Sequence, residues 1–378
     1  MAALIRLLDQ TAVALLARVA AARRPRQRPA AAAPPGPPVL AAIKLVGMGD
    51  AVLMLPSLAA ARQAGYQVTV VTTARCWGVF GAPGVADHLV VCEPRHPWRT
   101  WRAVRHALAD AAVVLDFEQH VNCSTALAQL TAGPARRHGF STRYRGRNRC
   151  YDHLVDPGAA PRHMKLCFDA LARSAGLAPH AGLAPLPLTD SAVARSAAWR
   201  ERHRLPAASF VVLAPGSGAS AEFRRLPAAT WAAIIAGLPA ARTPVLIGLA
   251  RERPLLDEIA RLAGRPVLCL LEHPLQDVAA LMRAAWRVVA TDSGPMHLAA
   301  AMGATVIGIF GPDTPARYAP YSARSASVSL QLACSPCNNC WVYREARCTN
   351  PARFACVRGI TAGQVLQALE PALAAASD

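Results

Sequence analysis

The sequence predicts an α/β protein with two Rossmann-like parallel-sheet domains that face one another across a cleft. Short β-rich runs alternate with helical runs from Val39 onward, which is the pattern of repeated β–α–β units. A stretch rich in Pro, Gly and Ala at 177–190 interrupts the alternation, which then begins again. Several strand-like runs end in Gly-rich or polar loops, and ligands of such sheets bind outside the carboxyl ends of the strands.

The first half of the chain carries four strand-like runs, at residues 39–46, 66–73, 88–93 and 111–117. Helical runs separate or follow them, and the clearest lie at 51–65, 98–109, 124–131 and 163–176. Residues 134–162 break this rhythm, because they are rich in Arg and show little periodicity. The alternation predicts an open parallel sheet for this half.

The second half repeats the pattern from Asp190 onward. Strand-like runs occupy 210–215, 243–249 and 266–271, and residues 288–312 are typical of two strands around a short helix. We therefore expect four segments: an N-terminal amphipathic and basic extension with a Pro-rich linker (1–38), one Rossmann-like domain (39–188), a second (189–333), and a Cys-rich segment with a final helix (334–378).

Composition points to a globular protein with an anionic partner. The chain has 378 residues, 53% of them hydrophobic, which suffices for two domains and excludes a disordered chain. The net charge is +18, and Arg supplies nearly all of the positive charge. A GC-rich genome accounts for part of this excess. The rest indicates a nucleotide, a phosphorylated glycolipid, a membrane surface or a nucleic acid.

Residues 3–21 are apolar, but Arg6, Asp9 and Arg18 interrupt them, so no window is long enough to span a membrane. We interpret them as a dispensable extension; the alternative is a peripheral helix on the inner membrane, to which their shared apolar face and the following "RRPRQR" are suited. Most of the eleven cysteines are scattered, which suits a reducing compartment and predicts a cytoplasmic protein.

Five of the cysteines lie between Cys334 and Cys356. Cys334 and Cys337 have the spacing of a metal knuckle, and Cys348 and Cys356 complete four thiolates, with Cys340 as a spare. This cluster predicts a structural Zn or Fe site. Free thiols or a labile disulfide are the alternative.

Candidate site residues follow the strands. In "GMGD", Gly47 and Gly49 permit a tight turn, and Asp50 stands where a helix begins, either as a functional carboxylate or as a helix cap. The second half offers a Gly/Ser loop with an Arg pair, an acidic residue after the next strand, and a polar strand-to-helix turn, all suited to an anion. These candidates are Gly216, Ser217, Gly218, Arg224, Glu252, Asp292, Ser293, Gly294 and His297.

These stretches resemble glycosyltransferase family 9, the ADP-heptose:lipopolysaccharide heptosyltransferases. The resemblance covers about residues 39–370 and rests on the ordered set "IKLVGMGDAVLMLPSLAAAR", "VVLDFEQHVNCSTALAQL…RRHGF", "VLAPGSG…EFRRLPAATW", "IGLARE" and "TDSGPMHLAAAMGATVIGIFGP". The segment "CSPCNNC…CTNPARFACVRGIT" is also similar to that family's cysteine segment. Two positions depart from the family pattern: Arg224 stands for a Lys and Leu226 for a Trp.

The resemblance implies the GT-B fold and an inverting transfer from an ADP-sugar to a lipopolysaccharide-core or similar anionic acceptor, with no cofactor needed for catalysis. It implies acceptor binding in the first domain, with Asp50 as the base, and donor binding in the second, through Arg224, Glu252, Asp292, Ser293, Gly294 and His297. From the Gly/Ser loop we further expect backbone contacts of Gly216, Ser217 and Gly218 with the donor diphosphate. For the acceptor we expect contacts from Gly49, Arg143 and Arg145, the last two within an Arg-rich stretch whose alternative is a solvated surface loop.

Two other functions stay open at this point. One is a GT-B enzyme that uses another nucleotide-sugar donor, and the other is a non-catalytic protein that binds anions. Nucleic acid is not expected as the partner, because the Arg residues are not interleaved with stacking aromatics and no nucleic-acid motif is present.

Overall fold

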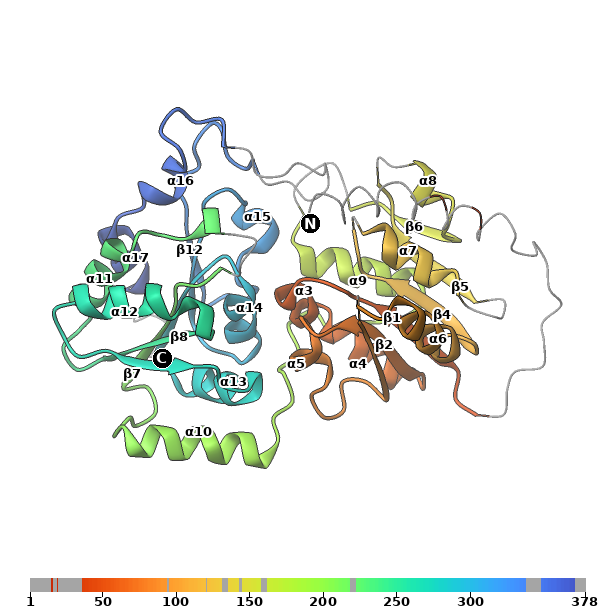
Figure 1. Cartoon of the computed structure of the whole chain (residues 1–378), viewed down its shortest axis with the longest axis horizontal. Coiled ribbons are helices and arrows are strands. Elements are labelled where there is room, and N and C mark those ends of the chain that lie inside the picture. Colours follow the sequence, from red (N-terminus) through yellow and green to blue (C-terminus); the bar gives the residue numbers. More distant parts are fainter. Residues whose placement is uncertain are drawn as a thin grey trace. The chain divides into compact units, whose positions relative to one another are not determined.

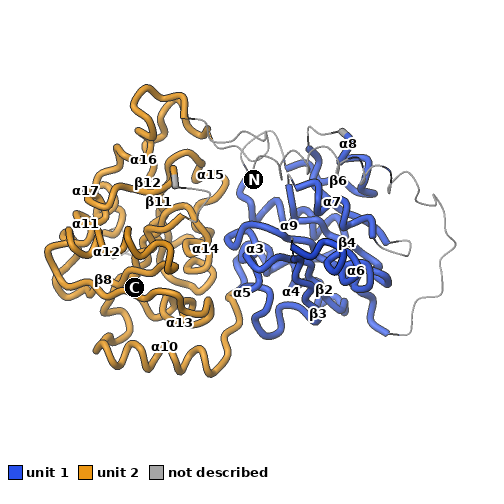
Figure 2. The backbone as a smooth tube through the Cα atoms, in the orientation of Figure 1, with its two compact units in different colours: residues 1–184, 340–343 blue, residues 185–339, 344–378 orange. Residues whose placement is uncertain are grey.

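The computed structural model of the protein describes Leu15, Val19 and residues 36–93, 95–119, 121–130, 135–142, 145–157, 162–217, 222–337 and 348–370. The chain divides into two compact units, one ending at Ala184 and the other beginning at Pro185 (Figures 1 and 2). Each unit holds one six-stranded parallel sheet with helices around it, which confirms the predicted fold class.

In the first unit the strand order is β3-β2-β1-β4-β5-β6. The strands are β1 (Val39–Ile43), β2 (Gln67–Thr73), β3 (His88–Cys92), β4 (Ala111–Asp116), β5 (Arg136–Phe140) and β6 (His153–Val155). The helices are α3 (Met48–Leu53), α4 (Leu55–Gln63), α5 (Trp77–Phe80), α6 (Pro97–Ala107), α7 (Asn122–Ala128), α8 (Arg145–Asn148) and α9 (Met164–Ser174). The central strands are rich in Val, Leu, Ile and Ala because both of their faces are buried.

The second unit has the equivalent order β12-β11-β10-β7-β8-β9. Its strands are β7 (Phe210–Ala214), β8 (Thr243–Gly248), β9 (Leu268–Leu271), β10 (Arg287–Thr291), β11 (Val306–Ile309) and β12 (Ala326–Val328). Its helices are α10 (Asp190–Arg202), η2 (Glu222–Arg224), α11 (Ala228–Gly237), η3 (Ala250–Glu252), α12 (Arg253–Leu262), α13 (Leu275–Ala284), α14 (Gly294–Ala301), α15 (Pro315–Tyr318), α16 (Ala355–Arg358) and α17 (Ala362–Leu369).

Both sheets reverse their strand order at one point, between β1 and β4 in the first unit and between β7 and β10 in the second. At such a switch point the loops after the two central strands diverge and leave room for a ligand at the carboxyl edge of the sheet. The register pairs Ile43 with Asp116 and Ala214 with Ala290, so the loops that follow each pair start side by side. The predicted site loops after residues 43, 214 and 291 begin at these points.

Residues 134–162 differ from the expectation of an irregular stretch, because they contain β5, α8 and β6. Two polar side chains of β5 are buried, and this hides the strand from a search for apolar alternation. The Arg137 guanidinium donates to the carbonyl oxygens of Ala128 and Ala135, both at 2.8 Å, and His138 Nδ1 is hydrogen-bonded to Ser174 Oγ at 2.8 Å.

The predicted N-terminal helix falls almost entirely outside the described residues, of which Leu15 and Val19 are helical and exposed. Among the described helices, none combines the length and the hydrophobicity that a bilayer crossing requires.

Candidate active site

Asp50 lies at the carboxyl edge of the first sheet, in the first turn of α3. The turn before it needs a glycine at position 47, where φ is +89° and an added Cβ would come within 3.2 Å of Asp50 Oδ2. Gly47, not Asp50, occupies the N-cap position, and no side chain caps the helix. The carboxylate is therefore not explained as a helix cap. Gly49 lies within the same turn.

Asp50 is held by a buried lysine that the sequence analysis did not single out. Lys44 Nζ donates to Asp50 Oδ2 at 2.8 Å, and its side chain is 1% exposed. Glu118, which follows β4, holds the other side of the ammonium group, with Oε2 at 3.4 Å from Nζ. Burial lowers the pKa of Lys44, but the two carboxylates outweigh it, so the pKa is raised above its ordinary value.

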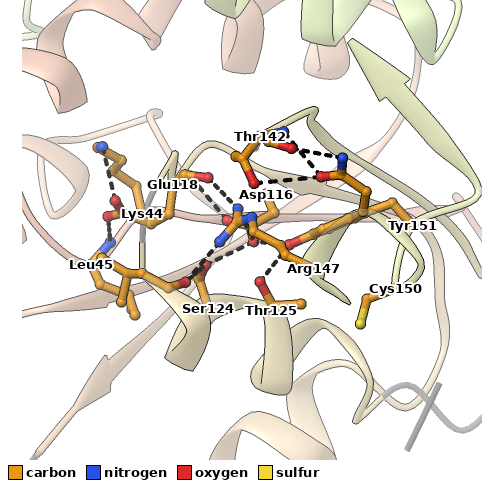
Figure 3. A network of polar contacts seen from close by, with 12 residues as sticks. Lys44, Leu45, Asp116, Glu118, Ser124, Thr125, Thr142, Arg147, Cys150 and Tyr151 are labelled. Atoms are coloured by element: carbon orange, nitrogen blue, oxygen red, sulfur yellow. Dashed lines mark hydrogen bonds and ion pairs between the residues drawn. The ribbon is translucent and has the colours of Figure 1, made fainter. Parts of the chain in front are cut away.

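Glu118 is in turn fixed to the backbone after β1. Its Oε1 accepts hydrogen bonds from Leu45 N at 2.7 Å and Val46 N at 2.9 Å (Figure 3). Burial raises the pKa of Glu118, while Lys44 and the two N–H donors oppose this. The loop after β4 thus ties the lysine and the loop after β1 together, and Asp50 is oriented by groups from both sides of the switch point.

A second buried carboxylate, Asp116, supports this arrangement (Figure 3). Its Oδ1 accepts from Glu118 N at 2.9 Å, and its Oδ2 accepts from Ser124 Oγ at 2.8 Å and from the Tyr151 hydroxyl. Arg147 Nη2 lies 3.2 Å from the same oxygen. These contacts make Asp116 a structural centre beneath the Lys44–Glu118 pair.

The Arg-rich stretch is therefore not uniformly a surface. Arg137 and Arg147 are buried and hydrogen-bonded within the unit, so neither an acceptor contact nor a solvated loop describes them. Their guanidinium groups donate to buried carbonyl and carboxylate oxygens. The sequence did not reveal this, because these acceptors lie in other segments of the chain. Arg143 lies outside the described residues. The backbone of Arg145 begins α8, and its side chain is outside the described part.

In the second unit, Gly216 and Ser217 follow β7. Gly216 lies against the Glu252 carboxylate, and an added Cβ would be 2.3 Å from Glu252 Oε1. Glu252 is buried, and its Oε2 accepts from Leu249 N at 3.0 Å. Thr291, at the end of β10, donates from Oγ1 to Gly216 O at 2.7 Å. The structure thus brings Gly216 and Glu252 together, while Gly218 lies outside the described residues.

Arg224 is the centre of a second group of charges. Its Nη1 lies 3.4 Å from Asp292 Oδ2 and donates to Asp292 O at 3.3 Å, and its Nη2 lies 2.5 Å from Asp313 Oδ2. Asp313 follows β11 and was not singled out from the sequence. The sequence feature that could have identified Asp313 is its position in "FGPDTP", shortly after a strand that lies next to the switch-point strand β10. Two buried carboxylates therefore fix the guanidinium at the carboxyl edge of the sheet.

Ser293, Gly294 and His297 form the start of α14. Ser293 Oγ donates to Thr291 O at 3.0 Å instead of capping the helix. His297 is buried, with its ring edge-on to Tyr318 at 6.3 Å between centroids. The Leu226 that departs from the family pattern is buried in the hydrophobic core of this unit together with Trp231.

The four predicted metal-binding cysteines, Cys334, Cys337, Cys348 and Cys356, line one pocket. Phe354 N donates to Cys348 Sγ at 3.2 Å and lowers the pKa of that thiol, whereas burial raises the pKa of Cys337 and of Cys356. Within the described residues, no three His, Cys, Asp or Glu side chains are placed to hold a metal ion. The ten described cysteines form no disulfide, and Cys340 is outside the described part.

Comparisons with known proteins agree with this architecture. The model of glycosyltransferase family 9 (heptosyltransferase) matches residues 98–342. The fold is similar to that of E. coli ADP-heptose LPS heptosyltransferase II, with 19% identity over 90% of this chain and 100% of that one and a TM-score of 0.67. E. coli heptosyltransferase WaaC, solved with ADP, has 21% identity, 88% and 99% coverage, and a TM-score of 0.64.

The iron-containing dodecameric glycosyltransferase TibC of enterotoxigenic E. coli is also similar in fold, with 16% identity, 90% and 77% coverage, and a TM-score of 0.56. A comparison with curated proteins finds no match. At these identities the solved structures share their fold with this chain, and the family model covers well over half of it.

Proposed function

Since the chain belongs to glycosyltransferase family 9 and is a glycosyltransferase, we propose that it transfers a heptose or a related sugar from an ADP-sugar to a lipopolysaccharide-core or similar anionic glycan, with inversion at the transferred carbon. The observation that carries this proposal is the placement of Asp50. Its carboxylate lies at the switch point of the first sheet and is oriented by Lys44, which Glu118 holds in turn. Two solved proteins of the same fold are named for heptosyl transfer, which supports the choice of sugar.

In the proposed reaction, an acceptor hydroxyl oxygen attacks the sugar carbon C1 and its proton passes to Asp50. The bond from C1 to the diphosphate oxygen breaks, and its electron pair leaves with ADP. A positioned base of this kind contributes about 10²- to 10⁴-fold to the rate. Gly49, beside Asp50, and Arg143 and Arg145 are proposed to contact the acceptor.

The leaving diphosphate needs positive charge and N–H donors at the carboxyl edge of the second sheet. We assign these to Arg224, to the backbone of Gly216, Ser217 and Gly218, and to the start of α14 at Ser293 and Gly294. Asp292 orients Arg224, His297 lies in the first turn of the same helix, and Glu252 is assigned to the nucleoside. With this charge in place the proposed transfer needs no metal ion.

The test compares Asp50→Asn with Asp110→Asn, an exposed carboxylate in the same unit. Transfer from ADP-heptose to a heptose-free core acceptor should fall by about 10²- to 10⁴-fold in the first variant and stay unchanged in the second. Calorimetry with ADP, UDP, GDP and dTDP, with and without EDTA, should show tight binding of ADP alone. Full transfer activity of Asp50→Asn contradicts the assignment of Asp50 as the base. Preferred binding of a nucleotide other than ADP would mean that the donor is a different nucleotide-sugar.

We also propose a structural Zn or Fe ion at the cysteine pocket. Four thiols are the donor set that these ions prefer, and the N–H bond to Cys348 favours its thiolate. Binding would have to draw the sulfurs together from their present positions. The iron content named for TibC is consistent with this proposal. The enzyme is further proposed to work in the cytoplasm, at the face of the inner membrane.

Metal analysis of the purified protein tests this site. Cys348→Ser should lose the metal, whereas Cys269→Ser, a change of an exposed cysteine far along the chain from the cluster, should keep it. Wild-type protein without metal, or equal metal in both variants, contradicts the proposal.

A further inference from the structure

Helix α6 exposes aromatic rings that the fold does not use. Trp98 is 66% exposed, and its ring stacks on that of Trp101 at 4.8 Å between centroids with an interplanar angle of 13°. The Arg105 guanidinium lies over the Trp101 ring at 5.2 Å. The inner face of the helix is accounted for, because Val104 is buried in the core of the first unit. The outer face therefore carries two organised indoles in contact with solvent.

The same face is strongly basic. Between Glu93 and Asp110 the sequence contains no acidic residue, but it contains Arg95, Arg99, Arg102 and Arg105. All four are exposed, and none forms an ion pair with a carboxylate of the described ranges. Other arginines of this unit, such as Arg62 with Asp87, are paired. The charge of α6 is thus left for a partner.

The position of α6 relates this face to the proposed active site. All strands of the sheet are parallel, and α6 begins shortly after β3 ends at Cys92 and packs against β3 and α7. Asp50 follows the end of β1, two strands away in the same sheet. The start of α6, with Trp98, therefore lies at the same carboxyl edge of the sheet as Asp50, and the rest of the helix runs back along the sheet.

We propose that the outer face of α6, together with Arg95 just before the helix, docks on an anionic lipid bilayer, with Trp98 and Trp101 in the headgroup region and the four arginines on lipid phosphates. Trp is favoured at membrane interfaces, because its ring is apolar and its N–H stays wet, and each Arg near an anionic surface adds attraction. Contrary to the expectation from the sequence, Arg residues do alternate with aromatic residues in α6. Trp101, however, already contacts Trp98 and Arg105, which leaves little ring face for stacking with nucleic-acid bases. This docking deepens the proposed function, on which it rests for its purpose: it brings Asp50 to the membrane that carries a glycolipid acceptor.

The test uses the full chain and acceptor-free phosphatidylcholine vesicles, with and without phosphatidylglycerol, in a co-sedimentation assay. Each Arg contributes about fivefold to partitioning, so Arg95→Gln, Arg99→Gln and Arg102→Gln combined should weaken binding by about a hundredfold. Trp98→Ala should weaken it by about tenfold. The matched control is Arg202→Gln, Arg261→Gln and Arg283→Gln, which removes the same charge from exposed helical positions of the second unit.

Binding that requires phosphatidylglycerol, weakens with salt, is lost in the α6 triple variant and survives in the control supports the proposal. Equal vesicle binding by the α6 triple variant and the control triple variant overturns the proposal. Binding only to vesicles that contain the acceptor glycolipid also overturns it, because α6 would then be an acceptor contact. Binding of single-stranded DNA without vesicle binding would also overturn it. The variant Asp50→Asn separates the two proposals. If it docks like the wild type and loses transfer activity, both the docking surface and the catalytic base are supported. If it docks and transfers at the wild-type rate, only the assignment of Asp50 as the base is contradicted.

Discussion

Replacing Lys44 by Met removes the cation that Asp50 and Glu118 share. Nζ lies 2.8 Å from Asp50 Oδ2 and 3.4 Å from Glu118 Oε2, and Lys44 is almost fully buried, so water screens these contacts weakly. Lys44 Nζ is the hydrogen-bond donor that fixes the Asp50 carboxylate, and a catalytic group misplaced by about 1 Å can cost about a hundredfold in rate. If Asp50 is the base, kcat/KM of transfer should fall by about ten- to a hundredfold in Lys44→Met.

Glu118→Gln should have a smaller effect on transfer than Lys44→Met. The amide keeps an acceptor for the N–H groups of Leu45 and Val46, removes a negative neighbour, and leaves the full charge of Lys44 to Asp50. Lys44 therefore keeps its hydrogen bond to Asp50, and kcat/KM should fall less than in Lys44→Met.

Stability gives a second readout with a defined sign. Lys44→Met leaves Glu118 buried without its cation, and breaking a buried pair in this way costs about 3–5 kcal/mol. The pKa of Glu118 in the folded state, already raised by burial, rises further above its unfolded value. The cost is therefore full at pH values above that folded pKa and shrinks as the pH falls through it, because protonation removes the unpaired charge.

The assay measures kcat/KM of transfer across pH for wild type, Lys44→Met, Glu118→Gln and the control Lys165→Met. Lys165 is an equally buried lysine of the same unit, paired with Asp169 at 2.7 Å and hydrogen-bonded to the carbonyl oxygens of His180 and Ala181. The control should lose stability but keep the kcat/KM of the wild type. An unchanged kcat/KM in Lys44→Met, or an equal fall in Lys165→Met, refutes the assignment of Lys44 as the residue that positions the base.

Three further outcomes are expected. Gly216→Ala should weaken donor binding, because the added Cβ would lie 2.3 Å from Glu252 Oε1. The control Gly363→Ala, where the nearest atom lies 3.9 Å from the added Cβ, should bind ADP like the wild type. Equal affinities of the two variants in calorimetry would contradict this prediction. Arg224→Gln should weaken ADP binding by about ten- to a hundredfold, because it removes a cation and leaves Asp292 and Asp313 facing the diphosphate. An ADP affinity equal to that of the control Arg202→Gln would argue against this site. Loss of metal on Cys348→Ser should also lower the melting temperature of the second unit, and an unchanged melting curve would mean that the ion has no structural role.

The sequence by itself was sufficient to predict the two Rossmann-like sheets and the loops at which candidate residues lie. Strand and helix alternation is a local property of the chain, and Gly47, Asp50, Gly216 and Asp292 stand directly after strands that their own apolar residues define. The family resemblance rested on the same stretches, and the family model confirms it.

The tertiary structure alone decided which side chains hold these residues in place. Lys44 meets Glu118 because the crossover places β1 beside β4, and Arg224 meets Asp292 because it places β7 beside β10. Asp313 joins them because β11 lies next to β10, and no periodicity in the sequence specifies these adjacencies. For the same reason Arg137 and Arg147 could not be recognised as buried. A charged side chain is buried only where partners from distant segments satisfy it, and those partners become neighbours only when the chain has folded.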